Sequence, residues 1–211
     1  MTQASCLARP AVSDAVRVDI RAKDFGTMPV LRDVRFQVAR GETVALLGPS
    51  GIGKSTTLRI VAGLDRDFRG SVFRPERMAV VFQEPTLLPW RTALQNLTLV
   101  HAGLGAADAL AALARVGLGG RENMFPLNLS LGQQRRLALA RAFAGRPELL
   151  IMDEPFASLD AEMADAMMAL TETLIAEARP ATILVTHAPT EAGRLASRIL
   201  ELHGQPATLR P

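Results

Sequence analysis

The sequence predicts an α/β fold whose core is a largely parallel β-sheet covered by helices on both sides. Two observations carry this prediction. Four runs are apolar on both faces, as the strands of a covered sheet are, at residues 43–47, 78–82, 149–152 and 182–185. Helical patterns lie between these runs, and the first run leads directly into a glycine-rich loop that opens a helix, which is expected to stop at Gly63.

The beginning of the chain has a different pattern. Residues 16–20 and 34–38 alternate between polar and apolar side chains, and the turn-forming residues 26–29 separate them. Such alternation is typical of strands with one face in solvent, and residues 16–20 have the pattern of an edge strand. An antiparallel β part is therefore expected ahead of the parallel sheet.

The middle of the chain is predicted to be helical. No strand-like run occurs between residues 83 and 145. Residues 106–116 are rich in alanine and leucine and stop at Gly117, and residues 133–144 form another helix. The apolar side of the first helix is predicted to consist of Leu110, Leu113 and Val116. This stretch is expected to be a helical subdomain inserted into the α/β core.

Length and composition indicate one domain. The chain has 211 residues, of which 48% are hydrophobic and 21% charged, and no uninterrupted apolar stretch approaches the ~18 residues of a membrane span. We expect one domain over residues 1–211. Its core spans about 15–83 and 146–203, and the helical subdomain spans about 84–145.

The first residues and the charge balance exclude several classes of protein. Residues 1–14 lack the basic start and apolar block of a secretory signal, and a loose tail is expected there. Cys6 is the only cysteine and cannot form an internal disulfide, which fits a reducing compartment. The net charge is only +3, without a Lys/Arg block, so no nucleic-acid partner is expected.

The strongest functional signal follows residues 43–47. Eight residues fit the phosphate-loop pattern G-x-x-x-x-G-K-[ST], namely Gly48, Pro49, Ser50, Gly51, Ile52, Gly53, Lys54 and Ser55. The glycines allow backbone N–H groups to turn onto phosphate oxygens without a Cβ in the way. Lys54 supplies charge to the β and γ phosphates, Ser55 offers a hydroxyl to Mg²⁺, and Thr56 completes the nucleotide-binding set. A chance glycine-rich turn is the alternative, and the coincidence of strand, loop and helix argues against it.

Two carboxylates follow another buried strand. Asp153 and Glu154 come after residues 149–152, at the carboxyl end of a strand, where ligands bind open α/β sheets. Asp153 is expected to hold Mg²⁺, directly or through water. Glu154 is expected to orient and deprotonate the water that attacks the γ phosphate. Acidic residues after a strand are common, and the phosphate loop in the same chain favours the catalytic interpretation.

The segment Leu-Ser-Leu-Gly-Gln at residues 129–133 precedes a helix. Ser130 and Gln133 have the spacing of an S-x-x-Q capping box, which is a structural explanation for the pair. The same helix start could also offer its hydroxyl and backbone amides to a phosphate carried by a second subunit. The two interpretations are compatible.

With these motifs in this order, the chain resembles the ATP-binding cassette (ABC) ATPases, whose signature L-S-G-G-Q lies shortly before the acidic Walker B motif. Gln83 matches the family's Q-loop, residues 158–160 match its D-loop, and His187 matches its switch histidine. The resemblance extends over nearly the whole chain. It implies an ABC-type phosphate-loop NTPase fold, with ATP and Mg²⁺ as ligands.

The resemblance also implies roles for single residues. Gln83 would contact Mg²⁺ and the attacking water, and His187 would hydrogen-bond the γ phosphate. Asp160 would act across a dimer interface, and Ser130, Gly132 and Gln133 would meet the nucleotide of the other copy. A lone histidine at a strand end is more often structural, and only the motif order favours a role for His187.

Phe25 occupies the family position of the aromatic residue that stacks on adenine, and a core phenylalanine is the alternative. His101 and His203 match no family motif and are given a structural interpretation. Two departures from the family pattern are visible. Leu131 stands where the signature has its first glycine, so that only Gly132 remains. Residues 64–77 are shorter than the usual hairpin, and too few residues follow His187 for a regulatory domain.

Residues 83–91 resemble the nitrate, sulfonate and taurine branch of bacterial importers. This segment contains Leu87, Leu88 and Trp90, the only tryptophan, together with two prolines. An exposed apolar cluster marks an interface, so we expect a membrane partner to dock near it. Packing of the three side chains inside the helical subdomain is the alternative.

The resemblance implies an ATP-hydrolysing subunit that powers a bacterial importer for nitrate, sulfonate, taurine or a similar small solute. Expected partners are transmembrane permease subunits, a second copy or a homologous ATPase, and indirectly a periplasmic solute-binding protein. The expected location is the cytoplasmic face of the inner membrane. Alternatives are an exporter or lipid-extraction ATPase, and an ABC ATPase that acts on DNA or ribosomes, although the chain has no coiled-coil or zinc insertion. A small-molecule phosphate-loop kinase is excluded by the signature and switch motifs.

Overall fold

The structure, a computed structural model, describes residues 14–210. Cys6 and most of the expected N-terminal tail lie outside the described residues. The central sheet has six strands in the order β5-β6-β7-β3-β8-β9, parallel from β5 to β8, with β9 antiparallel to β8. Its strands are β3 (Thr43–Leu47), β5 (Met78–Val81), β6 (Leu149–Asp153), β7 (Ala181–Thr186), β8 (Arg198–His203) and β9 (Thr208–Leu209). The four apolar runs therefore form the predicted parallel strands.

The antiparallel part is a separate three-stranded sheet in the order β2-β1-β4. It consists of β1 (Asp14–Phe25), β2 (Met28–Ala39) and β4 (Arg69–Phe73). The prediction of an edge strand at residues 16–20 is wrong, because β4 pairs with β1 on the side away from β2. Alternation reports a solvent-facing side of a strand, not the number of its neighbours. The predicted turn is also shorter, because Met28 and Pro29 already belong to β2.

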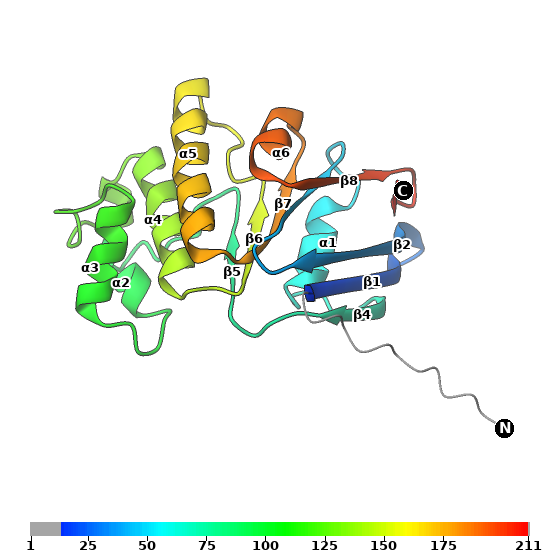
Figure 1. The fold of residues 1–211 in the computed structure, drawn as a ribbon, viewed down its shortest axis with the longest axis horizontal. Coiled ribbons are helices and arrows are strands. Elements are labelled where there is room, and N and C mark those ends of the chain that lie inside the picture. Colours follow the sequence, from blue (N-terminus) through cyan, green and yellow to red (C-terminus); the bar gives the residue numbers. More distant parts are fainter. Residues whose placement is uncertain (1–13, 211) are drawn as a thin grey trace.

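The described chain has the helices α1 (Lys54–Val61), α2 (Ala93–Thr98), α3 (Ala106–Arg115), α4 (Leu131–Ala144), α5 (Ala161–Ala178) and α6 (Pro189–Leu195), with a 3₁₀ turn η1 at Pro126–Asn128. Helices α2 to α5 gather at one end of the molecule, whereas α1 lies beside the three-stranded sheet (Figure 1). No strand interrupts the chain between β5 and β6, as predicted. On α3 the buried positions are Ala109, Leu113 and Val116, whereas Leu110 is exposed. The prediction is therefore confirmed for Leu113 and Val116 and wrong for Leu110, whose place on the buried side is taken by Ala109.

Side chains of the central strands point alternately to two apolar clusters. Leu150 and Leu184 join one cluster, with residues of α3, α4 and α5. Ile151 and Ile183 join the other, with residues of α1, β1 and β2. Both faces of the sheet are thus covered, which explains why these strands are apolar throughout. One face is covered by β-structure as well as by α1, which the prediction of helices on both sides did not include. Within residues 14–210, no helix is long and apolar enough to cross a membrane.

Candidate nucleotide-binding site

The glycine-rich loop joins β3 to α1 at the carboxyl edge of the central sheet. Gly51 has a φ of +78°, and Gly53, the N-cap of α1, has a φ of +112°. Both values lie in the region that side chains disfavour. A Cβ on Gly53 would also lie 2.7 Å from Leu31 Cδ2. No side chain caps α1. Its first backbone N–H groups are therefore free of side-chain partners and can receive an anion.

Lys54 is the charged centre of this loop. Its side chain is 4% exposed, and Nζ donates hydrogen bonds to the carbonyl oxygens of Gly48 (2.8 Å) and Pro49 (3.0 Å). The nearest carboxylate oxygen, Glu154 Oε1, lies 3.6 Å from Nζ. The ammonium is held by loop carbonyls and one carboxylate, in the place where the phosphate-loop pattern puts it.

Asp153 ends β6, the neighbour of β7, and its carboxylate reaches the start of α1. Ser55 Oγ donates to Asp153 Oδ1 at 3.2 Å, although the two residues are 98 positions apart. Burial raises the pKa of the Asp153 carboxyl, while the hydrogen bond from Ser55 opposes the shift. A half-buried carboxylate beside a hydroxyl is the donor set that Mg²⁺ prefers. These residues therefore fit the Mg²⁺ that the resemblance implies.

Glu154 lies between the phosphate loop and the end of β7. Its backbone is in the left-handed region, with a φ of +47°, a conformation that costs a non-glycine residue about 1 kcal/mol. Its N–H donates to Val185 O at 2.9 Å, which ties this unusual residue to β7. His187 follows β7, and its Nδ1 lies 3.2 Å from Glu154 Oε2. The parallel sheet thus brings together five predicted residues from three strand ends: Lys54, Ser55, Asp153, Glu154 and His187.

The signature residues are not part of this cluster. Ser130 and Gln133 form the complete capping box of α4, with Gln133 N donating to Ser130 Oγ (3.3 Å) and Ser130 N donating to Gln133 Oε1 (3.0 Å). The structural interpretation of this pair is therefore correct. In the described chain, no hydrogen bond joins Ser130, Gln133 or Gln83 to the phosphate loop or to Glu154. Asp160 caps α5, where its Oδ1 accepts a bond from Met163 N at 2.8 Å.

The replacement of the first signature glycine by Leu131 has a packing explanation. Gly132 is buried against α5, and a Cβ at this position would lie 2.9 Å from Met163 Sδ. Leu131 is 49% exposed. A side chain is therefore accommodated at residue 131, whereas at residue 132, the remaining glycine of the signature, it would require Met163 to shift.

Phe25 lies at the end of β1 and is 50% exposed, so the alternative of a core phenylalanine is wrong. Lys23 Nζ lies 4.6 Å from the centroid of its ring, within cation–π range. Lys23 is itself buried and ion-paired with Asp65 (2.9 Å) and Asp67 (3.5 Å). The sequence analysis missed Lys23, because its partners are 42 and 44 residues away and leave no local pattern.

The apolar segment after Gln83 is a well-fixed loop. The side chain of Asn96, fully buried, accepts a bond from Leu88 N (2.8 Å) and donates to the carbonyls of Leu88, Arg91 and Thr92. Trp90 is 66% exposed, so the alternative that it packs inside the helical subdomain is wrong. Leu87 does pack against the core. The loop therefore presents a tryptophan to solvent on a fixed backbone.

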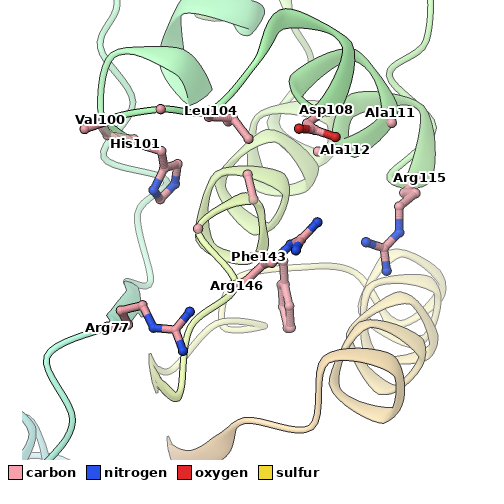
Figure 2. A pocket seen from close by; sticks show the side chains of 14 residues that line it. Arg77, Val100, His101, Leu104, Asp108, Ala111, Ala112, Arg115, Phe143 and Arg146 are labelled. Carbon is pink, nitrogen blue, oxygen red and sulfur yellow. The ribbon is translucent and has the colours of Figure 1, made fainter.

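A wide cleft of about 590 Å³ lies elsewhere, between α3, the end of α4 and the start of β5 (Figure 2). Arg77, Arg115 and Arg146 line it, and the first two are ion-paired with Glu148 and Glu177. Arg77 and Arg146 precede β5 and β6, so the cleft lies at the amino ends of strands whose carboxyl ends carry the phosphate-loop cluster. None of the predicted site residues lines it. Its His101 ring contacts Arg141 O at 2.6 Å, in keeping with a structural role.

Comparisons with known proteins agree with this geometry. A family model described as "ABC transporter" matches residues 31–157. The aliphatic sulfonates import ATP-binding protein SsuB 3 of Paraburkholderia xenovorans is 49% identical over 187 residues, which cover 88% of this chain and 76% of that protein. The protein named SsuB 2 of Nocardia farcinica is 50% identical over 193 residues, with 89% and 79% coverage.

A solved structure supports the fold independently. CbiO1 of Clostridium perfringens, described as part of the ABC transporter complex cbiONQ, matches with a TM-score of 0.82 and 22% identity, over 94% of this chain and 88% of that one. The predicted α/β fold of ABC type is confirmed. With the family model and relatives close to half identical, the chain belongs to the ABC transporter family, as one of its ATP-binding, ATP-hydrolysing subunits.

Proposed function

We propose that this subunit powers a bacterial importer for an aliphatic sulfonate or a similar small anion. The observation that carries the ATPase part is the convergence of Lys54, Glu154 and His187 at one edge of the sheet. The solute class is supported by relatives of 49–50% identity that are named as aliphatic sulfonate import proteins. Nitrate and taurine remain the alternatives within the same branch.

In this proposal the phosphates of ATP lie in the loop Gly48–Ser55, with Thr56 in the first turn of α1. Lys54 and the free N–H groups of α1 bind the phosphate oxygens, and Phe25 stacks on the adenine. Ser55, Asp153 and Gln83 would hold Mg²⁺, which would neutralise phosphate charge. Gln83 is exposed and lies two positions after the end of β5, at the carboxyl edge of the parallel strands.

Glu154 is proposed as the general base. Its carboxylate accepts a proton from the water that attacks the γ phosphate, and His187, 3.2 Å away, holds that carboxylate in place and bonds the phosphate. Lys54 Nζ lies 3.6 Å from Glu154 Oε1, so the ammonium and the carboxylate act at the same place. Glu154, His187 and Lys54 thus have complementary roles at the proposed position of the γ phosphate.

A second copy completes the site. Ser130 and Asp160 are exposed, and within the described residues their hydrogen bonds go to Gln133 and Met163, not to the phosphate loop of their own subunit. The capped start of α4, including Gly132 and Gln133, is proposed to meet the nucleotide of the other copy. Hydrolysis then lets the two copies separate, and this motion passes to permease subunits at the cytoplasmic face of the membrane. A solute-binding protein acts through the permease.

The effect of candidate solutes on ATP hydrolysis tests the solute class. The chain is co-purified with its cognate permease, reconstituted in proteoliposomes and supplied with its binding protein. ATP hydrolysis is expected to rise several-fold with an alkanesulfonate and to stay at the basal rate with nitrate. The opposite preference would reassign the solute. A rate that no anion alters would contradict an import function.

The exposed tryptophan gives a test of permease docking. Trp90→Asp is expected to reduce co-purification of the permease at least ~10-fold, because an unpaired charge in an apolar interface costs several kcal/mol. Since the side chain is solvent-exposed, folding and ATP binding should be unchanged.

Phe73→Asp is the matched control, because Phe73 is another exposed aromatic residue, on β4. It should retain normal permease recovery. Leu88→Asp is expected to act as Trp90→Asp does, with a lower melting temperature because Leu88 is partly buried. Full permease recovery with Trp90→Asp would contradict docking at this segment.

A further inference from the structure

One buried arginine of α4 lies outside every assigned role. Arg135 is 7% exposed, and no acidic residue within residues 14–210 forms an ion pair with it. Burial lowers the pKa of its guanidinium. Burial of a cation without a counter-ion costs free energy, so the guanidinium needs another favourable contact. That contact is with backbone: Nη1 donates to Pro155 O at 2.9 Å, and Nη2 donates to Ala157 O at 2.7 Å.

Those two carbonyls belong to the turn that carries the proposed base. The turn contains two non-glycine residues with positive φ, Glu154 at +47° and Ser158 at +63°, and Arg135 binds the carbonyls between them. Such conformations persist only where their surroundings hold them. Glu154 N–H is held by β7 on one side. On the other side, the planar guanidinium of Arg135 holds the turn through two bonds.

Arg135 also lies where three segments of the chain meet. It lies five positions after Ser130 on α4. Together with Phe82 and Pro85, from the loop after β5, and Pro155 and Phe156, it lines a void of only about 10 Å³. The Q-loop, the signature helix and the turn of Glu154 are therefore in close packing around this one side chain.

We propose that Arg135 is a positioning residue, which transmits the position of α4 to the Glu154–Asp160 turn and so places the Glu154 carboxylate for hydrolysis. The inference rests on the proposed role of Glu154 as the base. When α4 shifts as the signature meets a second copy, the two carbonyls move with the guanidinium. Arg135 itself contacts neither ATP nor the attacking water.

Turnover by the reconstituted transporter separates positioning from binding. Arg135→Met is expected to lower kcat at least ~10-fold while the KM for ATP changes less than about 2-fold, because small misplacements of a catalytic group cost large rate factors. Arg135→Lys should recover only part of kcat, because one ammonium does not reproduce a planar two-bond contact. Full recovery of kcat in Arg135→Lys would show that only the positive charge matters, and would overturn the proposal.

Arg136 supplies the matched control. It is the next residue on α4, and its Nη1 donates to Val116 O at 3.1 Å, away from the Glu154 turn. Arg136→Met should leave kcat unchanged. If both variants lower kcat equally, or if Arg135→Met only lowers the melting temperature, the role is structural and the proposal fails.

Hydrogen exchange in the full chain gives a readout that does not depend on catalysis. Arg135→Met should speed exchange of the Ala157 and Leu159 amides, which donate to Glu154 O and Phe156 O, and leave the amides of α4 unchanged. Unchanged exchange in the turn would overturn the proposal.

A double-mutant cycle then asks whether Arg135 acts through Glu154. In a Glu154→Gln background, Arg135→Met should cause no further loss of turnover, because the group it positions is no longer a base. Additive losses would overturn the proposal. Near-normal turnover of Glu154→Gln alone would remove the base role instead, and the exchange result would still decide whether Arg135 holds the turn.

Discussion

Lys54→Ala is expected to abolish ATP binding, and not only turnover. Lys54 is the one cation inside the phosphate loop, and its Nζ is held there by Gly48 O and Pro49 O. Charge-assisted hydrogen bonds contribute up to about 3 kcal/mol each, so removal of this ammonium should weaken ATP binding ~10²-fold or more. Isothermal titration calorimetry of the purified subunit measures the dissociation constant.

Because Lys54 is 4% exposed, its removal could also disturb the loop. A melting curve separates the two effects, and Arg66→Ala provides a control, since Arg66 is an exposed cation in the loop after α1. The control should bind ATP as the wild type does. An unchanged dissociation constant for Lys54→Ala in a folded protein would refute the phosphate-loop assignment.

Glu154→Gln should keep ATP binding and lose hydrolysis by ~10²-fold or more, which is the contribution of a positioned general base. Glutamine has the same shape and can keep a hydrogen bond to His187, but its amide cannot accept the proton of the attacking water. Loss of the carboxylate 3.6 Å from Lys54 Nζ removes no phosphate contact. The ATP-bound dimer should therefore persist, which size-exclusion chromatography with ATP can detect.

Glu148→Gln is the matched control for this experiment. Glu148 immediately precedes β6, the strand that Glu154 follows, and its carboxylate is paired with Arg77 at 2.8 Å. It lies at the opposite end of the strand from the phosphate loop, so phosphate release should continue at the wild-type rate. Wild-type turnover by Glu154→Gln would rule out its role as base.

Four strands of the central sheet, β3, β5, β6 and β7, were predictable because each carries its own signal, whereas β8 and β9 carry none and were missed. Residues buried on two faces are apolar at every position, and the chain from 149 to 152 needs no distant partner to show this. β4 has no such signal, because its residues are mostly exposed and it is held by backbone pairing with β1. α2 is only six residues long, and its Thr92–Gln95 capping box was a usable signal that was overlooked.

For the site, the sequence predicts the residues better than their contacts. Parallel strands end at a common edge, so the approach of Asp153 to Ser55 follows from topology. The left-handed backbone of Glu154 does not follow from its residue type. Nor does the burial of Lys23 or Arg135, because their carboxylate and carbonyl partners come from distant parts of the chain. Polar contacts between residues far apart in the sequence produce no local periodicity, so the sequence pattern does not reveal them.

The buried amide of Asn96 has a thermodynamic consequence for assembly. Its four hydrogen bonds to Leu88, Arg91 and Thr92 order a stretch of chain that has no regular structure of its own. The backbone entropy of this loop is therefore lost when the subunit folds, not when a partner arrives. A permease that covers Trp90 would immobilise mainly one side chain, at about 0.5–1.5 kcal/mol, and most of its contact energy would remain as affinity.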